Sequence, residues 1–375
     1  MRAPRAYIIA EAGVNHNGSM EMAKRLIDAA AGAGADAVKF QTFRAEALVS
    51  ASADKARYQI EATGNGETQF EMLKRLELDE AAHAEIIAHS KMRGIQFLST
   101  PFDLKSVAML TERFALPVLK IPSGEITNAP LLLEAARTGT RIILSTGMST
   151  LTEIETGLGV LAFGYTRQGN APSIDGFREA YEGEAGKKAL GGKVTLLHCT
   201  TEYPAPFEDV NLRAMETMRS AFRLPVGLSD HTEGIAVAIA AAALGACVIE
   251  KHVTLDRGLP GPDHRASLEP DGLEEMVRSI RQIESALGTG EKAPAPSEAQ
   301  NMGVARKSLV AGRDIKKGEV FTEENLAVKR PGTGLSPLFY WEMLGKTAPR
   351  AFRKDEPVES GAPLKSSDVG AERPR

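Results

Sequence analysis

The stretch 225-PVGLSDHTEGIAVAIAAAALGACVIEKH-252 contains one complete structural unit of the chain. It begins with a short apolar run, 225-PVGLS-229, continues through an alanine-rich segment that ends at Gly245, and closes with a second apolar run, 247-CVIEKH-252. Glycine after the last residue of such a segment is a common helix stop. The order strand, helix, strand predicts two parallel strands that are joined by a helix.

The same order recurs along most of the chain. Six more apolar runs rich in Val, Ile and Leu are found at 7-YIIAE-11, 37-AVKFQ-41, 95-IQFLS-99, 117-PVLKI-121, 141-RIILS-145 and 194-VTLLHC-199. Eight strand–helix repeats over about 250 residues are typical of a (β/α)₈ TIM barrel. The alternative is a doubly wound open sheet, but no Gly-rich dinucleotide-binding motif follows any of the strands. We therefore expect an α/β barrel.

The composition of the chain divides it into four parts. The predicted barrel spans residues 1–288, and a Pro/Ala/Ser-rich linker, 289–304, follows it. A second domain with short strands and many turns is expected over 305–358, and a polar tail over 359–375.

Two connections within the barrel are long. Residues 44–79 follow the second strand on the side where barrels keep their sites, and their Gly-rich centre, 63-TGNGETQ-69, predicts a lid. Residues 164–192 follow a helix and precede a strand. This order puts them on the opposite rim, where a structural or interaction role is expected.

Charge and cysteine content exclude several classes of protein. The net charge of the 375 residues is −4, which gives no sign of a nucleic-acid or anionic-membrane surface. Two cysteines are too few for a disulfide scaffold and fit a reducing compartment. No signal peptide is apparent, and no apolar run approaches the roughly 20 residues that cross a bilayer. A cytoplasmic protein with no membrane or nucleic-acid partner is expected.

Polar or ionisable side chains stand at nearly all of the eight strand ends. In a barrel these ends converge on one mouth, where functional side chains lie. The candidates are Glu11, Lys39, Gln41, Thr100, Lys120, Ser123, Glu125, Ser145, His198, His231, Lys251 and His252.

His198 and His231 follow neighbouring strands, so their imidazoles are expected to face one point. Two imidazoles with open positions for water or substrate oxygen suit a divalent transition metal. The alternative is that each histidine is a hydrogen-bonded core residue, and no Cys/His spacing motif decides between the two. Cys199 is interpreted as a small buried hydrophobe.

Lys39 and Lys120 lie inside otherwise apolar strands. A buried lysine is costly unless it meets an anion or loses its proton. Both ammonium groups could bind a phosphate and a carboxylate, with help from the hydroxyls of Ser123 and Ser145. One lysine could instead form a Schiff base, or each could pair with Glu11 or Glu125. Glu11 either moves a proton or serves as a counter-charge.

The motifs resemble those of the nonulosonic (sialic acid-type) synthases, which include N-acetylneuraminate and N,N'-diacetyllegionaminate synthases. The resemblance runs from about Ala6 to Phe352. It rests on IIAEAGVNHNG, KFQTF, LSTPFD, KIPSGEITN, ILSTGM, LHCTTEYPAPFEDVNL, GLSDHTEGI, IEKHVTLD and GPDHRASLEP, and then on RKSLVAGRDIKKGE and KRPGTG. It implies that the small C-terminal domain is an antifreeze-like (SAF, β-clip) domain.

The resemblance also implies a reaction. Phosphoenolpyruvate condenses with an N-acetylated amino-sugar aldehyde and water, and phosphate is released by C–O cleavage. Manganese or magnesium would be held by His198 and His231. The family's catalytic positions match Glu11, Lys120 and Glu125, and its substrate-binding positions match Lys39, Gln41, Thr100, Phe102, Ser123, Ser145 and Arg330.

Arg330 matches an arginine that the antifreeze-like domain inserts into the partner subunit's barrel, so the resemblance implies a domain-swapped homodimer. Phe40 and Phe43 stand where sialate synthases tend to have histidines. This favours 2,4-diacetamido-2,4,6-trideoxymannose over N-acetylmannosamine as the aldehyde. A Schiff-base sugar aldolase and a non-catalytic glycan- or ice-binding protein are the other functions considered.

Overall fold

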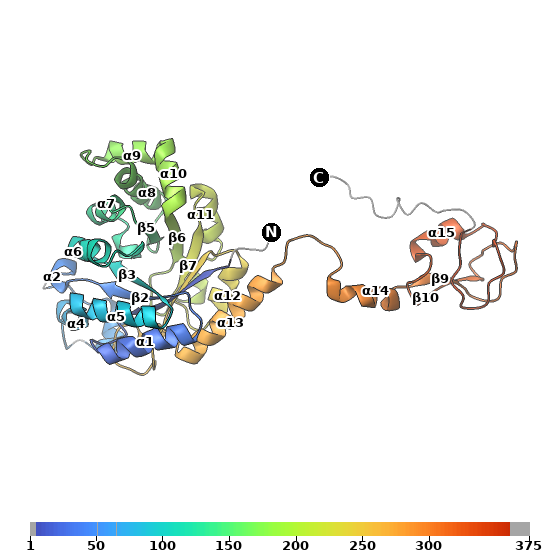
Figure 1. The fold of residues 1–375 in the computed structure, drawn as a ribbon, viewed down its shortest axis with the longest axis horizontal. Helices are drawn as coiled ribbons and strands as arrows, with labels where there is room; N and C mark the ends of the chain where they lie inside the picture. The colour runs from blue at the N-terminus through green and yellow to red at the C-terminus, as the bar shows by residue number, and fades with distance from the viewer. Residues whose placement is uncertain (1–4, 51, 65, 361–375) are drawn as a thin grey trace. The chain divides into compact units, whose positions relative to one another are not determined.

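The computed structural model describes residues 5–50, 52–64 and 66–360. Its chain forms two compact units that divide between Thr289 and Gly290. The first unit is an eight-stranded parallel barrel with helices outside it (Figure 1). Of the predicted polar tail 359–375, residues 361–375 lie outside the described residues.

The predicted strands are all present, within one or two residues of their expected ends. Neighbouring strands pair in parallel in the order β3-β2-β1-β8-β7-β6-β5-β4, and β3 and β4 lie side by side to complete a near-closed barrel. The bounds are β1 Tyr7–Gly13, β2 Ala37–Thr42, β3 Gln96–Pro101, β4 Val118–Ile121, β5 Arg141–Ser145, β6 Val194–Cys199, β7 Val226–Asp230 and β8 Val248–His252.

Helices follow or connect these strands. Most begin at a side chain that caps the first turn, such as Ser19, Asp79 and Thr150. The barrel helices are α1 Met20–Gly32, α5 Glu80–Met92, α6 Leu104–Ala108, α7 Ala129–Arg137, α8 Leu151–Thr166, α11 Ala214–Phe222, α12 Ala236–Ala243 and α13 Pro270–Ala286. Short helical turns occupy Met109–Arg113, Ser123–Glu125, Phe207–Asp209 and His264–Ala266.

A layer of buried apolar side chains fills the inside of the barrel, and Tyr7, Val118 and Cys247 pack against it. This layer consists of Ile9, Ala37, Leu98, Ile143, Leu197 and Val248. Because side chains alternate between the two faces of a strand, the residues two positions further along also point inward, towards the mouth. The residues between them face the helices.

Little space remains inside this layer at β7. A Cβ atom on Gly227 would lie 2.3 Å from the backbone oxygen of Val248 and 2.8 Å from Leu197 Cδ2. Glycine therefore leaves room for the two larger side chains that pack beside it.

The predicted lid, residues 44–79, consists of α2 Ala45–Leu48, α3 Arg57–Thr63 and α4 Gln69–Leu76. Its centre is fastened by the buried ammonium group of Lys55. The Nζ atom of Lys55 donates to Thr63 Oγ1 at 2.9 Å and to the Gly64 carbonyl at 3.1 Å, and lies 3.2 Å from a carboxylate oxygen of Glu67.

The long connection 164–192 forms two helices, α9 Ile174–Glu182 and α10 Glu184–Lys193, which pack against α8 (Figure 1). The rings of Phe163 in α8 and Phe177 in α9 meet edge to face, with centroids 5.3 Å apart. α10 leads directly into the start of β6.

The second unit has its own small core. β9 Ser308–Ala311 pairs with β10 Leu326–Lys329 in an antiparallel sheet. Phe321, Phe352 and Met343 are buried beneath it. The predicted linker, 289–304, includes a short turn, Pro296–Glu298, and most of α14 Ala299–Ala305; the turn Pro337–Phe339 and α15 Tyr340–Met343 complete the unit.

Across the described segments, no helix has both the length and the apolar character needed to span a bilayer.

Candidate active site

A cavity of about 440 Å³ opens at the carboxyl ends of the strands. Its floor is made of inward-facing residues from the barrel, and one wall is made of lid residues, among them Leu48, Gln59 and Met72. The prediction that residues 44–79 cover the mouth agrees with this arrangement.

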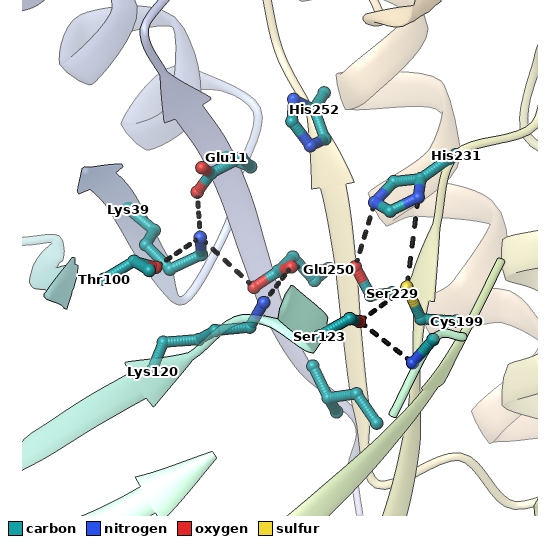
Figure 2. Close-up of polar contacts among 12 residues, drawn as sticks. Glu11, Lys39, Thr100, Lys120, Ser123, Cys199, Ser229, His231, Glu250 and His252 are labelled. Atoms are coloured by element: carbon teal, nitrogen blue, oxygen red, sulfur yellow. Dashed lines mark hydrogen bonds and ion pairs between the residues drawn. The ribbon is translucent and has the colours of Figure 1, made fainter. Parts of the chain in front are cut away.

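Four charged side chains meet at the floor of the cavity (Figure 2). The ammonium group of Lys39 lies 2.5 Å from Glu11 Oε2 and 3.6 Å from Glu250 Oε2. Lys120 lies 3.1 Å from Glu250 Oε1. All four side chains are at least nine-tenths buried, so the charges act on one another with little screening by water.

The environment separates the two carboxylic acids by their pKa values. Burial and the charge of Glu250 raise the pKa of Glu11 to about 7, although Lys39 opposes the shift. Burial would also raise the pKa of Glu250, but Lys120 and Lys39 hold it well below its usual range. Glu250 is therefore a permanent anion, whereas Glu11 can both donate and accept a proton near neutral pH.

Several predicted polar residues lie around these charges. Thr100 Oγ1 accepts a hydrogen bond of 3.1 Å from Lys39, and Gln41 Nε2 donates one of 3.3 Å to Glu11 Oε1. Ser123 Oγ accepts a hydrogen bond of 2.9 Å from the backbone N–H of Gly147. The hydroxyl of Ser145 is buried and has no partner among the described residues. An unsatisfied buried hydroxyl that lines a cavity indicates a missing polar ligand.

The structure does not bring His198 to the mouth. Leu197 and Cys199 face the inside of the barrel, so the alternation of the strand turns His198 towards the helices. There its Nε2 atom donates a hydrogen bond of 2.6 Å to the carbonyl of Val210. The expectation that His198 and His231 face one point is therefore not met. Cys199, interpreted from sequence as a core residue, lines the cavity instead, 3.5 Å from Ser123 Oγ.

His252 takes the place expected for His198. The rings of His231 and His252 both line the cavity, with centroids 5.4 Å apart (Figure 2). His231 Nδ1 donates to the carbonyl of Thr200 at 2.7 Å, which leaves Nε2 as the ring's lone-pair nitrogen. His252 Nδ1 is buried without a hydrogen-bond partner in the described part of the chain.

These two imidazoles fit a bound metal ion. Burial, together with the neighbouring His231 and Lys39, lowers the pKa of His252 well below its ordinary value, so the ring is neutral. A neutral ring with an unpartnered nitrogen, next to a ring whose tautomer is fixed by a carbonyl, is a common ligand arrangement. Within the described ranges no group of three or more His, Cys, Asp or Glu side chains is placed to hold an ion. Water or substrate oxygen would therefore complete the coordination.

Comparison with known proteins identifies the family. The sequence profile described as the NeuB family matches residues 26–292, and the SAF domain profile matches residues 306–374. The chain belongs to the NeuB family.

The relatives of this NeuB-family chain match it over most of its length. It is 52% identical to the N,N'-diacetyllegionaminic acid synthase of Campylobacter jejuni over 94% of this chain and 98% of the relative. It is 45% identical to the synthase of the same name from Legionella pneumophila, over 88% and 87% of the two chains. Among solved structures, the N-acetylneuraminic acid synthetase of Leptospira borgpetersenii in complex with citrate is 33% identical, with a TM-score of 0.63 over 80% of this chain and 90% of that one.

Three other predicted site residues of the NeuB-family chain are not gathered at the floor of the cavity. Phe102 lines the cavity on its lid side. Glu125 does not line it; its carboxylate accepts a hydrogen bond of 2.6 Å from Asn128 Nδ2. Arg330 is an exposed residue of the second unit, where its Nε atom donates to the carbonyl of Ala305 at 3.0 Å.

Phe40 and Phe43 do not line the cavity either, which corrects the reason given for the choice of sugar. Phe40 lies between the inward-facing Lys39 and Gln41, so it faces the helices and packs against Phe97, with ring centroids 5.9 Å apart. Phe43 is buried beneath the lid, where it meets Phe102 edge to face at 6.1 Å. Neither ring can contact a sugar in the cavity.

Two cavity residues of the NeuB-family chain have no role in the sequence-based prediction. Glu250 stands in the quoted run CVIEKH without an assigned function, and Asp263 follows the last strand. Burial raises the pKa of Asp263 to about 6, and its carboxylate lies 3.6 Å from His252 Nδ1. Side chains alternate between the two faces of a strand. Since Val248 faces the inside of the barrel, Glu250, two residues later, is expected to face the inside as well.

Proposed function

We propose that the cavity condenses phosphoenolpyruvate with 2,4-diacetamido-2,4,6-trideoxymannose to give N,N'-diacetyllegionaminic acid and phosphate. The chain is a nonulosonic acid synthase, a transferase that joins phosphoenolpyruvate to an N-acetylated amino sugar. The observation that carries the proposal is the pair of buried ammonium groups, Lys39 and Lys120, at the floor of a cavity that also contains an unpartnered Ser145 hydroxyl. Two fixed cations and hydroxyl donors suit a ligand with a phosphate and a carboxylate.

The residues around the floor support the bond changes of this reaction. C3 of the enol attacks the aldehyde carbon, water adds at C2 of the resulting cation, and the C–O bond to phosphate breaks. Lys39 and Lys120 would hold the anionic groups of phosphoenolpyruvate beside the aldehyde, so that proximity and charge lower the barrier. Glu11, with a pKa of about 7, would move the proton between water and the sugar oxygen.

A divalent ion, manganese or magnesium, would be held by His231 and His252. When bound it supplies Lewis-acid polarisation of the aldehyde oxygen. This assignment keeps one residue of the predicted pair and replaces His198 by His252, for the reason of strand alternation given above.

The sugar assignment is supported by the two relatives named N,N'-diacetyllegionaminic acid synthase. It no longer depends on Phe40 and Phe43. The cavity itself supports it, because Leu48, Met72 and Leu76 give the lid side an apolar surface that suits the methyl group of a 6-deoxy sugar.

A Schiff-base aldolase is not supported by the charges at the floor. A Schiff-base lysine needs a lowered pKa, whereas the carboxylates of Glu11 and Glu250 outweigh burial and raise the pKa of Lys39. Lys120 is held in an ion pair with Glu250. A binding protein without catalytic activity would have no need for the buried charges of Lys39, Lys120 and Glu250, each of which is costly to bury.

The domain-swapped homodimer and the cytoplasmic location remain proposals. In this dimer Arg330 of one subunit would contact the N-acyl group of the sugar in the partner's barrel. Mixing a Glu11→Gln protein with an Arg330→Ala protein tests it, because a swapped hybrid contains one intact site and recovers part of the activity. No recovery after the subunits have exchanged would contradict the swap.

The decisive experiment measures phosphate release from phosphoenolpyruvate with each aldehyde, with and without Mn²⁺. We expect release to require the aldehyde and the ion, and kcat/KM to be higher with 2,4-diacetamido-2,4,6-trideoxymannose than with N-acetylmannosamine. A covalent adduct trapped by borohydride, together with activity in the presence of a chelator, would support the aldolase instead.

A further inference from the structure

Two glutamine side chains of the lid, Gln59 in α3 and Gln69 in α4, line the same cavity as the charged floor. Gln69 Nε2 donates a hydrogen bond of 3.3 Å to Gln59 Oε1. Two primary amides that face each other can form two such bonds, one in each direction. Here only one is formed between the described atoms.

The orientation of Gln59 is fixed by the backbone. The N–H of Ala56 donates to Gln59 Oε1 at 3.0 Å, so this oxygen receives two donors and the amino group must point the other way. The hydrogen bonds described for the pair engage Gln59 Oε1 and Gln69 Nε2, so its other polar atoms are one donor, Gln59 Nε2, and one acceptor, Gln69 Oε1. The pair therefore offers one donor and one acceptor at the cavity wall.

The surrounding lid holds this pair in place. The backbone carbonyl of Gln59 accepts a hydrogen bond of 2.8 Å from Thr63 Oγ1, and the same hydroxyl accepts from Lys55 Nζ at 2.9 Å. Lys55 also bonds to Gly64 and Glu67, and so ties the end of α3 to the turn that leads into α4. These contacts restrain α3 and the turn after it, which lowers the cost of ordering the pair when a ligand binds.

This donor and this acceptor match the two polar atoms of a secondary amide. An acetamido group has a carbonyl oxygen that needs a donor, an N–H that needs an acceptor, and a methyl group that needs an apolar surface. Leu48, Val49 and Leu73, also from the lid, supply that surface in the same cavity. A hydroxyl group at the same place has no methyl group to cover the apolar surface, and it is too small to reach both polar partners.

We infer that Gln59 and Gln69 bind the second acetamido group of the sugar and so determine the preference for a diacetamido over a monoacetamido substrate. Gln59 Nε2 donates to the acetamido carbonyl, and Gln69 Oε1 accepts from the acetamido N–H. The inference rests on the proposed function, because it concerns the sugar in that reaction. A site built to hydrogen-bond a group discriminates strongly against a substrate without it, since its own polar atoms are then left unpaired.

Two substitutions separate recognition from the structure of the lid. Gln59→Glu keeps the Oε1 acceptor for Ala56 and Gln69 but replaces the amino donor by an oxygen. Gln69→Met keeps the length of the side chain and removes its acceptor. Gln168→Glu is the matched control. Gln168 follows the C-terminal end of α8, lies outside the cavity, and donates a hydrogen bond to the carbonyl of Arg137.

The experiment measures kcat/KM of the full-length, metal-loaded enzyme for both sugars, KM for phosphoenolpyruvate, and Tm. We expect each cavity variant to lower kcat/KM for the diacetamido sugar by about 10- to 100-fold, the loss typical of an unsatisfied buried partner. Most of the loss should appear in KM for the sugar. The values for N-acetylmannosamine and phosphoenolpyruvate should change by less than about 3-fold, within the range of surface substitutions, and Gln168→Glu should resemble the wild type.

Equal losses with both sugars would overturn the inference, because they would indicate that the glutamines only support the lid. Unchanged selectivity in Gln69→Met, with Tm retained, would overturn it even if Gln59→Glu does not fold. Both results leave the proposed function intact when the wild type prefers the diacetamido sugar. A wild-type preference for N-acetylmannosamine would instead overturn the sugar assignment, and the inference with it.

Discussion

Lys120 and Glu250 form a 3.1 Å ion pair between two strands, β4 and β8, that lie on opposite sides of the barrel. An eight-stranded barrel is just wide enough for side chains to meet at its axis. The ion pair therefore crosses the floor of the cavity, and Glu250 also lies 3.6 Å from Lys39. In the proposed reaction an incoming phosphate or carboxylate would take over the role of this internal anion at both lysines.

The first prediction concerns the charge at the floor. Lys120→Met removes one of the two cations proposed to bind phosphoenolpyruvate. We expect kcat/KM for phosphoenolpyruvate to fall by about 100- to 1000-fold, the usual loss for one preorganised electrostatic contact. Steady-state kinetics with phosphoenolpyruvate varied at saturating sugar measure this effect.

Lys251 provides the control from the opposite face of β8. Its ammonium group is fully buried outside the cavity, 2.8 Å from Asp230 Oδ2. Lys251→Met leaves that carboxylate uncompensated and should cost about 3–5 kcal/mol of unfolding free energy in urea titrations. KM for phosphoenolpyruvate should not change in the folded fraction. A stable Lys251 variant with weakened phosphoenolpyruvate binding would reverse the assignment of the two faces.

The second prediction distinguishes the histidines. His252→Ala should abolish Mn²⁺ binding in equilibrium dialysis and Mn²⁺-dependent phosphate release. His198→Ala removes only the hydrogen bond to Val210, so we expect it to retain Mn²⁺ and to lose about 1 kcal/mol of stability. Retention of the ion by the His252 variant and its loss from the His198 variant would restore the original ligand pair.

The third prediction tests the packing inside the barrel. The methyl group of Gly227→Ala would clash with the Val248 carbonyl at 2.3 Å, and the backbone there cannot yield without disturbing two strand pairs. We expect about 1–3 kcal/mol of destabilisation in urea unfolding. Gly191→Ala in α10 meets no atom within 4 Å and should be neutral or stabilising by about 0.5–1 kcal/mol. Equal effects would contradict this account of the core.

The fourth prediction concerns pH. Burial, with smaller effects from His83 and His264, lowers the pKa of His16 from 6.5 to about 4. Between these values the unfolded chain binds a proton that the folded chain does not, so stability falls as pH decreases. From pH 7 to pH 5 the contribution of His16 is about 2 kcal/mol.

His16→Gln removes this contribution. The loss of unfolding free energy between pH 7 and pH 5 should therefore be smaller in the variant by about the same 2 kcal/mol. Urea titrations at the two pH values measure it. An identical pH dependence in the two proteins would mean that His16 is protonated in the fold.

The fold could be predicted from sequence because the strand signals are local. Runs such as RIILS and VTLLHC, each followed or preceded by a helix signal, locate the strands nearly to the residue. The lid was recognised from its position after β2. The helices α9 and α10 were not, since the Gly-rich composition of 164–192 indicates a loop, and their stability comes from packing on α8.

The site was harder because strands of a parallel barrel are apolar on both faces. In LLHC the leucines give no sign of which side is inside, so His198 was assigned to the mouth although it faces the helices. For the same reason Glu250 was given no role in the prediction, and Phe40 was wrongly expected to face the sugar. If the orientation of one residue of β8 were known, such as that of Val248 towards the inner layer, the orientation of the other side chains of the strand would follow. Gln59 and Gln69 carry no pattern at all, and only folding brings them together.

The pair of helices α9 and α10 lies against the outer side of α8 and contributes no residue to the cavity. Its exposed surface is therefore a suitable place to attach a fluorophore, an affinity tag or a solid support. Because these helices lie outside the cavity, a label or support attached there should not block the entry of substrates. The kinetic experiments above could therefore be carried out on immobilised enzyme.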